Sequence, residues 1–211
     1  MRNSKLNSSL KPTFRFELGA GFALFCALVY FFGEGSFLAA LLSAVAAHEL
    51  GHMLLMLFFG AYPTHLKTAL SGLEIDYSGN ISPLQEMLTA LGGPALGLLF
   101  SVVCARLGRL WDSDFLILTA GLGFILNAFN FLPAEPLDGG RVLDYILRAL
   151  FGERAALRTL RLTGYLTCAL LAGVGIFSFS RGLGPVPLFA GLWLFILQQN
   201  KSCKWTRPGI Q

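Results

Sequence analysis

Two histidines four residues apart, with a glutamate beside the first, are the residues of this chain best suited to chemistry. The motif His48-Glu-Leu-Gly-His52 has the pattern H-E-x-x-H, in which two imidazoles bind one zinc ion and the glutamate serves as a base toward a bound water. Positions i and i+4 of a helix share one face, about 6 Å apart along the axis. We therefore expect His48 and His52 to be metal ligands and Glu49 to be the catalytic base.

The motif lies within an apolar run, residues 36–59, in which its three polar residues are the only ionisable ones. An ionisable residue at the centre of a membrane helix costs about 2.5–3.5 kcal/mol on insertion scales, so such residues are usually functional. A chance match to the motif would leave three polar groups without compensation in lipid. The pattern therefore indicates a single zinc ion bound inside a membrane.

Composition independently indicates a membrane protein. Of the 211 residues, 55% are hydrophobic and 13% are charged, whereas soluble domains carry about 25% charged residues. The net charge of +4 does not indicate a nucleic-acid partner, because the basic residues lie at the ends of apolar segments, as anchors at a lipid surface do. The four cysteines show no C-x-x-C spacing, so neither a disulfide scaffold nor a thiolate metal site is expected.

Hydropathy predicts an all-α, multi-spanning membrane protein with about six transmembrane helices. The apolar segments are 16–33, 36–59, 87–106, 115–133, 160–180 and 185–199, of which the first and last are shorter than the roughly 20 residues that a crossing needs. We expect one membrane-embedded domain over 1–211, with a core at 36–140, a basic arm at 1–13 and a basic tail at 200–211.

Two elements are expected outside the spans. Apolar and acidic residues alternate over 73–77, after a Ser71-Gly72 turn, which predicts a small β-hairpin inserted after the motif helix. Its edge could hold an extended peptide; the alternative is an ordinary surface hairpin or a disordered loop. Apolar residues at helical spacing from Val142 to Leu150 predict an amphipathic helix on the inner membrane surface.

The distribution of lysine and arginine predicts the orientation. With the amino terminus inside, 13 of the 16 basic residues face the cytoplasm, and only Arg106, Arg109 and Arg181 lie outside. We therefore expect a multi-pass protein of the cell membrane with both termini cytoplasmic.

A catalytic zinc site normally has three protein ligands and one open position, so the histidine pair needs a partner. The carboxylate best placed to supply it is Asp138, in the stretch Asn130-Phe-Leu-Pro133-Ala-Glu-Pro136-Leu-Asp138-Gly-Gly140, where two prolines break the helix. Broken backbone at membrane depth is tolerated where it lines a cavity or is buried in protein. The alternative is that Asp138 only caps the following helix; beside H-E-x-x-H, we favour the ligand.

These two motifs together resemble the site-2 protease family of intramembrane zinc proteases, and most closely the stage IV sporulation protein FB class without its CBS domain. The resemblance covers roughly residues 36–140. It implies zinc bound by His48, His52 and Asp138, with Glu49 as general base, and it implies that Asn130 holds the substrate or its oxyanion. One departure is Gly97, which stands where the family often has asparagine, in Gly92-Gly93-Pro94-Ala-Leu-Gly97. We expect these small residues only to allow close helix packing.

The resemblance implies hydrolysis of peptide bonds in or near a transmembrane segment of a membrane-tethered substrate. The expected partners are that substrate, the lipid bilayer and a regulatory membrane protein, with no nucleic acid. One alternative is a non-catalytic membrane protein with a structural zinc or metal-handling site, which would need a fourth protein ligand. A transporter is another, but the inverted repeat expected of one is not visible in the sequence.

Overall fold

A computed structural model describes residues 15–32, 35–69, 72–135, 137–182 and 184–205. This part of the chain contains seven helices and three strands. Their order is β1 (Arg15–Leu18), α1 (Ala20–Phe32), α2 (Gly35–Phe58), β2 (Tyr62–Ala69), β3 (Gly72–Ser78), α3 (Pro83–Leu110), α4 (Asp114–Asn130), α5 (Asp138–Phe151), α6 (Glu153–Ser180) and α7 (Val186–Trp205). The predicted arm 1–13 and the end of the tail, 206–211, lie outside the described residues.

Each of the six predicted apolar segments contains a helix. Three of these helices, α2, α3 and α6, are long and apolar enough to cross a membrane, and α4 and α7 are shorter apolar helices. The predicted first span, 16–33, is wrong at its start, because residues 15–18 form β1 and leave α1 with 13 residues. The described part of the chain is therefore mostly helical, as expected, with three helices that are both long and apolar enough for a full crossing.

The predicted hairpin forms, and it belongs to a larger sheet. β2 pairs antiparallel with β3, and β1 pairs parallel with β2, which gives the strand order β1-β2-β3. Parallel strands need a long crossover connection, and here α1 and α2 provide it. β1 was not predicted, because its 4 residues run directly into the apolar segment that forms the next helix.

Local signals set the ends of the two helices that line the site. α2 ends in a Schellman motif, in which Gly60 has φ 80° and Ala61 donates to the carbonyl of Met56. α3 begins with a capping box: the backbone N–H of Gln85 donates to the Ser82 side chain, and the backbone N–H of Ser82 donates to the Gln85 side chain.

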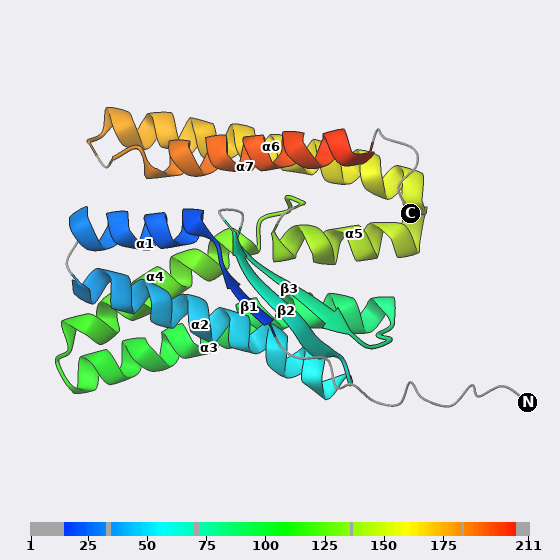
Figure 1. The fold of residues 1–211 in the computed structure, drawn as a ribbon. Helices are drawn as coiled ribbons and strands as arrows, with labels where there is room; N and C mark the ends of the chain where they lie inside the picture. Colours follow the sequence, from blue (N-terminus) through cyan, green and yellow to red (C-terminus); the bar gives the residue numbers. More distant parts are fainter. Residues whose placement is uncertain (1–14, 33–34, 70–71, 136, 183, 206–211) are drawn as a thin grey trace, which may run out of the picture.

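Figure 1 shows α2, α3 and α4 as one group of neighbouring helices, and α6 and α7 as a helical hairpin. α5 contacts both α3 of the group and α6 of the hairpin. The segment between α4 and α5 reaches this hairpin: Ala134 and Leu137 pack in one buried cluster with Cys168 of α6 and Leu194 of α7. The predicted amphipathic helix is α5, and it holds its first residue, Asp138, against the helix group.

Candidate metal centre

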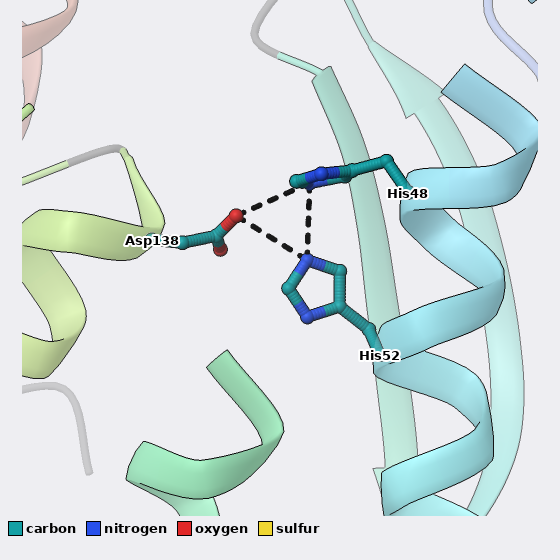
Figure 2. Close-up of side chains that lie close together, drawn as sticks. All are labelled: His48, His52 and Asp138. Atoms are coloured by element: carbon teal, nitrogen blue, oxygen red, sulfur yellow. Dashed lines mark hydrogen bonds and ion pairs between the residues drawn. The ribbon is translucent and has the colours of Figure 1, made fainter. Parts of the chain in front are cut away.

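Three side chains from two distant parts of the chain converge at one point (Figure 2). The Nε2 atoms of His48 and His52, both on α2, lie 3.2 Å apart. Oδ2 of Asp138, the first residue of α5, lies 3.2 Å from Nε2 of His48 and 3.3 Å from Nε2 of His52. All three residues are buried, and in the described part of the chain they are the group that could hold a metal ion.

Glycines bring α2 and α3 into backbone contact beside the histidines. A Cβ atom on Gly51, between the two histidines, would lie 2.1 Å from the carbonyl oxygen of Gly92. A Cβ atom on Gly93 would lie 2.1 Å from Nε2 of His52, so the His52 ring fits only because this residue of α3 has no side chain. The expectation that Gly92 and Gly93 permit close packing is confirmed.

The bend before α5 presents Asp138 to the histidines. The N-cap of α5 is Leu137 rather than Asp138, and no side chain caps this end, so the interpretation of Asp138 as a helix cap is wrong. Gly139 and Gly140 let the chain fold back on itself, because a Cβ atom on either would strike the carbonyl oxygen of Phe131 or Ala134. The carboxylate is also favoured by its place in the first turn of a helix.

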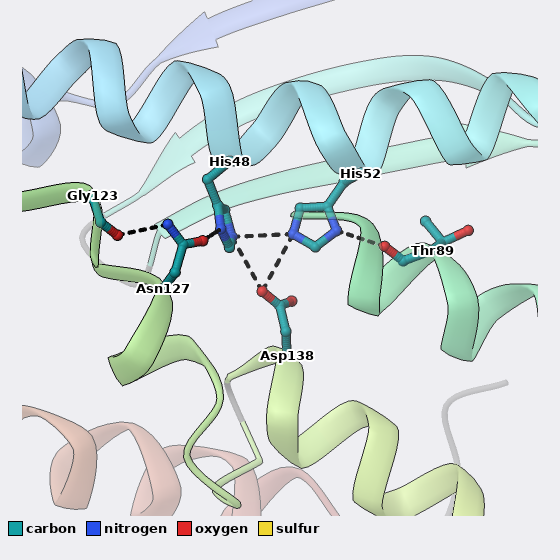
Figure 3. A network of polar contacts seen from close by, with 6 residues as sticks. All are labelled: His48, His52, Thr89, Gly123, Asn127 and Asp138. Carbon is teal, nitrogen blue, oxygen red and sulfur yellow. Dashed lines mark hydrogen bonds and ion pairs between the residues drawn. The ribbon is translucent and has the colours of Figure 1, made fainter. Parts of the chain in front are cut away.

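Each histidine is held at its other ring nitrogen by a hydrogen-bond acceptor (Figure 3). Nδ1 of His48 lies 2.8 Å from Oδ1 of Asn127, and Nδ1 of His52 lies 2.8 Å from the carbonyl oxygen of Thr89. Each Nδ1 therefore donates, and each neutral imidazole directs the lone pair of Nε2 inward. Two nitrogen lone pairs and one carboxylate oxygen then face one another, an arrangement that a divalent cation stabilises and that suits the N and O ligands of zinc.

The surroundings of Asp138 favour its ionised form. Burial disfavours the carboxylate, but a proton on Nε2 of His48 or His52 would donate to Oδ2 and bring a positive charge, which lowers the pKa of Asp138 below its ordinary value.

The other residues named from the sequence lie at different distances from this cluster. Glu49 is half-buried on α2 and interacts electrostatically with His52, His48 and Asp138. Asn130 is the half-buried last residue of α4; among the hydrogen bonds of the described residues, none joins it to the cluster. His65 lies in β2, opposite Asp76, and is not part of the metal-binding group.

Sequence reasoning missed the two groups that hold the histidines. Asn127 stands three residues before Asn130, on the same face of one helix, so a second amide one turn upstream was the available signal. The acceptor for His52 is a backbone carbonyl of Thr89, which has no sequence signal of its own.

Comparison with known proteins connects this geometry to a family. The model of peptidase family M50 matches residues 106–174, a range that contains Asp138. Zinc metalloprotease MJ0392 of Methanocaldococcus jannaschii is 26% identical over 151 residues, which cover 69% of this chain and 44% of that protein. The protein sll0528 of Synechocystis sp. is 31% identical over 121 residues, which cover 54% of this chain and 32% of that protein.

The fold is also that of a solved protein. The site-2 protease from Methanocaldococcus jannaschii superposes with a TM-score of 0.68 at 20% identity, over 93% of each chain. Residues 106–174 are therefore similar to peptidase family M50, and the fold is that of a site-2 protease. The chain spans less than half the length of the two zinc metalloproteases named above. Its buried His48, His52 and Asp138 form the zinc site, which combines the H-E-x-x-H helix with the aspartate that follows α4.

Proposed function

We propose that the chain is an intramembrane zinc metalloprotease that cuts a membrane-tethered protein within or near its transmembrane segment. This proposal rests on one observation: the side chains of His48, His52 and Asp138 form a buried cluster, and Glu49 is next to His48 in the chain. A closed structural site would need a fourth protein ligand, and the metal-binding group of the described residues has three. An open fourth position suits catalysis better than structural support.

The chemistry divides between the ion and the chain. Zinc, when bound, polarises the scissile carbonyl and makes a bound water more acidic. Glu49 lies next to His48 in sequence and interacts electrostatically with all three ligands. Its carboxylate would accept the proton of the attacking water and return it to the leaving amine. Asn130, at the end of α4, would hold the substrate or its oxyanion.

The sheet supplies a place for the substrate. A transmembrane helix must unwind before water can attack its carbonyls, and an extended peptide is best held by strand addition to a sheet edge. β2 contacts α2, and Figures 2 and 3 show the strands beside the helix that carries the two histidines. We propose that the unwound segment of the substrate pairs with an edge of this sheet, which β1 and β3 form.

We also propose the topology that the basic residues indicate. α1, α2, α3, α4, α6 and α7 would give six crossings with both termini in the cytoplasm, and α1 and α4 would cross where the protein thins the bilayer. We propose a single domain over 1–211 of the stage IV sporulation protein FB type, gated by a regulatory membrane partner.

The decisive experiment replaces Glu49 with Gln. The Glu49→Gln variant should retain zinc and lose all cleavage of co-expressed single-span substrates, because the amide keeps the shape of the side chain but cannot accept the proton. Metal content and cleavage are measured on the same preparations. Cleavage at the wild-type rate would exclude Glu49 as the base, and loss of zinc would show that its role is in metal binding.

A further inference from the structure

Asn127 is fully buried, with an exposed fraction of 0%, and its amide makes two hydrogen bonds. Nδ2 donates to the carbonyl oxygen of Gly123 at 2.6 Å, and Oδ1 lies 2.8 Å from Nδ1 of His48. A carbonyl can only accept, so the Gly123 contact requires the NH₂ group of the amide and turns Oδ1 toward His48. This oxygen in turn requires a proton on Nδ1. One amide, anchored to its own helix, therefore selects the tautomer that leaves Nε2 of His48 free to bind a metal.

The space for this amide comes from a different helix. A Cβ atom on Gly97 of α3 would lie 2.4 Å from Oδ1 and 2.5 Å from Nδ2 of Asn127. Real Cβ atoms essentially never approach other atoms to less than 3.0 Å. Any side chain at position 97 would therefore displace the amide from His48 or push α4 away from α3.

We propose that Asn127 is a positioning residue for His48 and that Gly97 is its necessary complement, so that positions 97 and 127 act as one unit. Neither residue touches the metal. The unit instead determines how tightly the metal is held and how the His48 ring is oriented. This inference rests on the zinc site of the proposed function but not on proteolysis. Changes to residues that hydrogen-bond a metal-binding histidine typically weaken metal affinity about 10- to 100-fold.

The test uses the full chain purified in detergent, with zinc and cobalt as probes. Zinc affinity is measured by competition with a chelator, and ligand geometry by the visible absorption of bound Co²⁺. Asn127→Leu keeps the approximate shape and removes the acceptor, so zinc affinity should fall about 10- to 100-fold and the Co²⁺ bands should shift. Asn127→Asp should restore most of the affinity, because a carboxyl protonated toward Gly123 still accepts from Nδ1 of His48.

The dependence on Gly97 is tested by a double-mutant cycle. Gly97→Ala should lower zinc affinity about as much as Asn127→Leu, and the double variant should be no weaker than either single variant. Gly121→Ala on α4, where an added Cβ meets nothing within 4 Å, controls for the substitution of a glycine. Thr119→Ala, which removes a buried hydroxyl that bonds within α4, controls for the loss of a buried polar group. Both controls should keep wild-type affinity.

The outcomes separate this proposal from the proposed function. Wild-type zinc affinity and an unchanged Co²⁺ spectrum in Asn127→Leu would overturn the positioning role, and losses that multiply in the double variant would overturn the unit. A loss of zinc affinity in Asn127→Asp as large as that in Asn127→Leu would overturn the proposed role of Oδ1 as the acceptor for His48. If Asn127→Leu does not fold, Asn127→Ala carries the same expectation. None of these readouts requires cleavage, so a chain that binds zinc but cuts no substrate would still test the proposal.

Discussion

The contact between α2 and α3 makes Gly51→Ala the most informative single substitution in this chain. The Cβ atom of the new alanine would lie 2.1 Å from the carbonyl oxygen of Gly92, 2.7 Å from its carbonyl carbon and 2.9 Å from Cα of Gly93. All three are backbone atoms, so no side chain can rotate away. Ordinary van der Waals contact begins at 3.4 Å, and the helices must therefore separate by about 1.3 Å at this point if contact is to be ordinary.

That separation acts directly on the metal site. The hydrogen bond from Nδ1 of His52 to the Thr89 carbonyl is 2.8 Å long and joins the same two helices, so an added 1 Å or so would break it. Overpacking of this kind typically costs about 1–3 kcal/mol of stability. A misplacement of about 1 Å in an active site can lower activity about 100-fold. We therefore expect weaker zinc binding, a lower unfolding temperature and a much larger loss of cleavage.

The assay compares Gly51→Ala with Gly173→Ala on α6, where an added Cβ meets nothing within 4 Å. Zinc affinity, thermal unfolding without added metal and substrate cleavage are measured for both. Gly173→Ala should resemble the wild type or be slightly more stable, because alanine is the better helix former. Equal zinc affinity and equal unfolding temperature for the two variants would refute the backbone contact between α2 and α3.

The remaining predictions concern the metal and the start of α3. Asp138→Asn keeps the shape of the side chain and removes its charge, so zinc per chain in the purified protein should fall; full retention would remove Asp138 from the ligand set. A strong chelator should lower the unfolding temperature, and zinc but not magnesium should restore it, because a ligand at 100 times its Kd stabilises the folded state by about 2.7 kcal/mol; an unchanged unfolding temperature would contradict binding at this site. Ser82→Ala removes the N-cap of α3 and should cost about 1 kcal/mol with zinc affinity unchanged, and a loss of zinc affinity would show that the capping box also positions Thr89.

Residue identity was enough to predict the ligands, because each carries its chemistry in its own side chain. His48 and His52 have the spacing of one helix face, and Asp138 follows a break that a membrane helix tolerates only in protein surroundings. The structure brings these three side chains together. The expected hairpin also forms, because period-two alternation and a turn are local signals.

What the sequence did not reveal depends on contacts between distant segments. β1 becomes a strand by pairing with β2, in which Arg15 lies opposite His65, and four residues next to an apolar helix give no signal of that pairing. Gly97 was interpreted as a packing residue without a polar role. The structure shows that the space it leaves is filled by the amide of Asn127, a relation that requires the crossing of α3 and α4 to be known.

The position of the third ligand depends on parts of the chain that supply no ligand. Asp138 begins α5 directly after Leu137, and Leu137 is buried with Ala134 against Cys168 of α6 and Leu194 of α7. The packing of the segment before α5 on the α6–α7 hairpin therefore helps to place the carboxylate, together with the contact between α5 and α3. The two histidines, by contrast, are held by α3 and α4. A movement of the hairpin relative to α2, α3 and α4 would change the distance from Asp138 to both Nε2 atoms at once, and so couple the packing of α6 and α7 to the affinity for zinc.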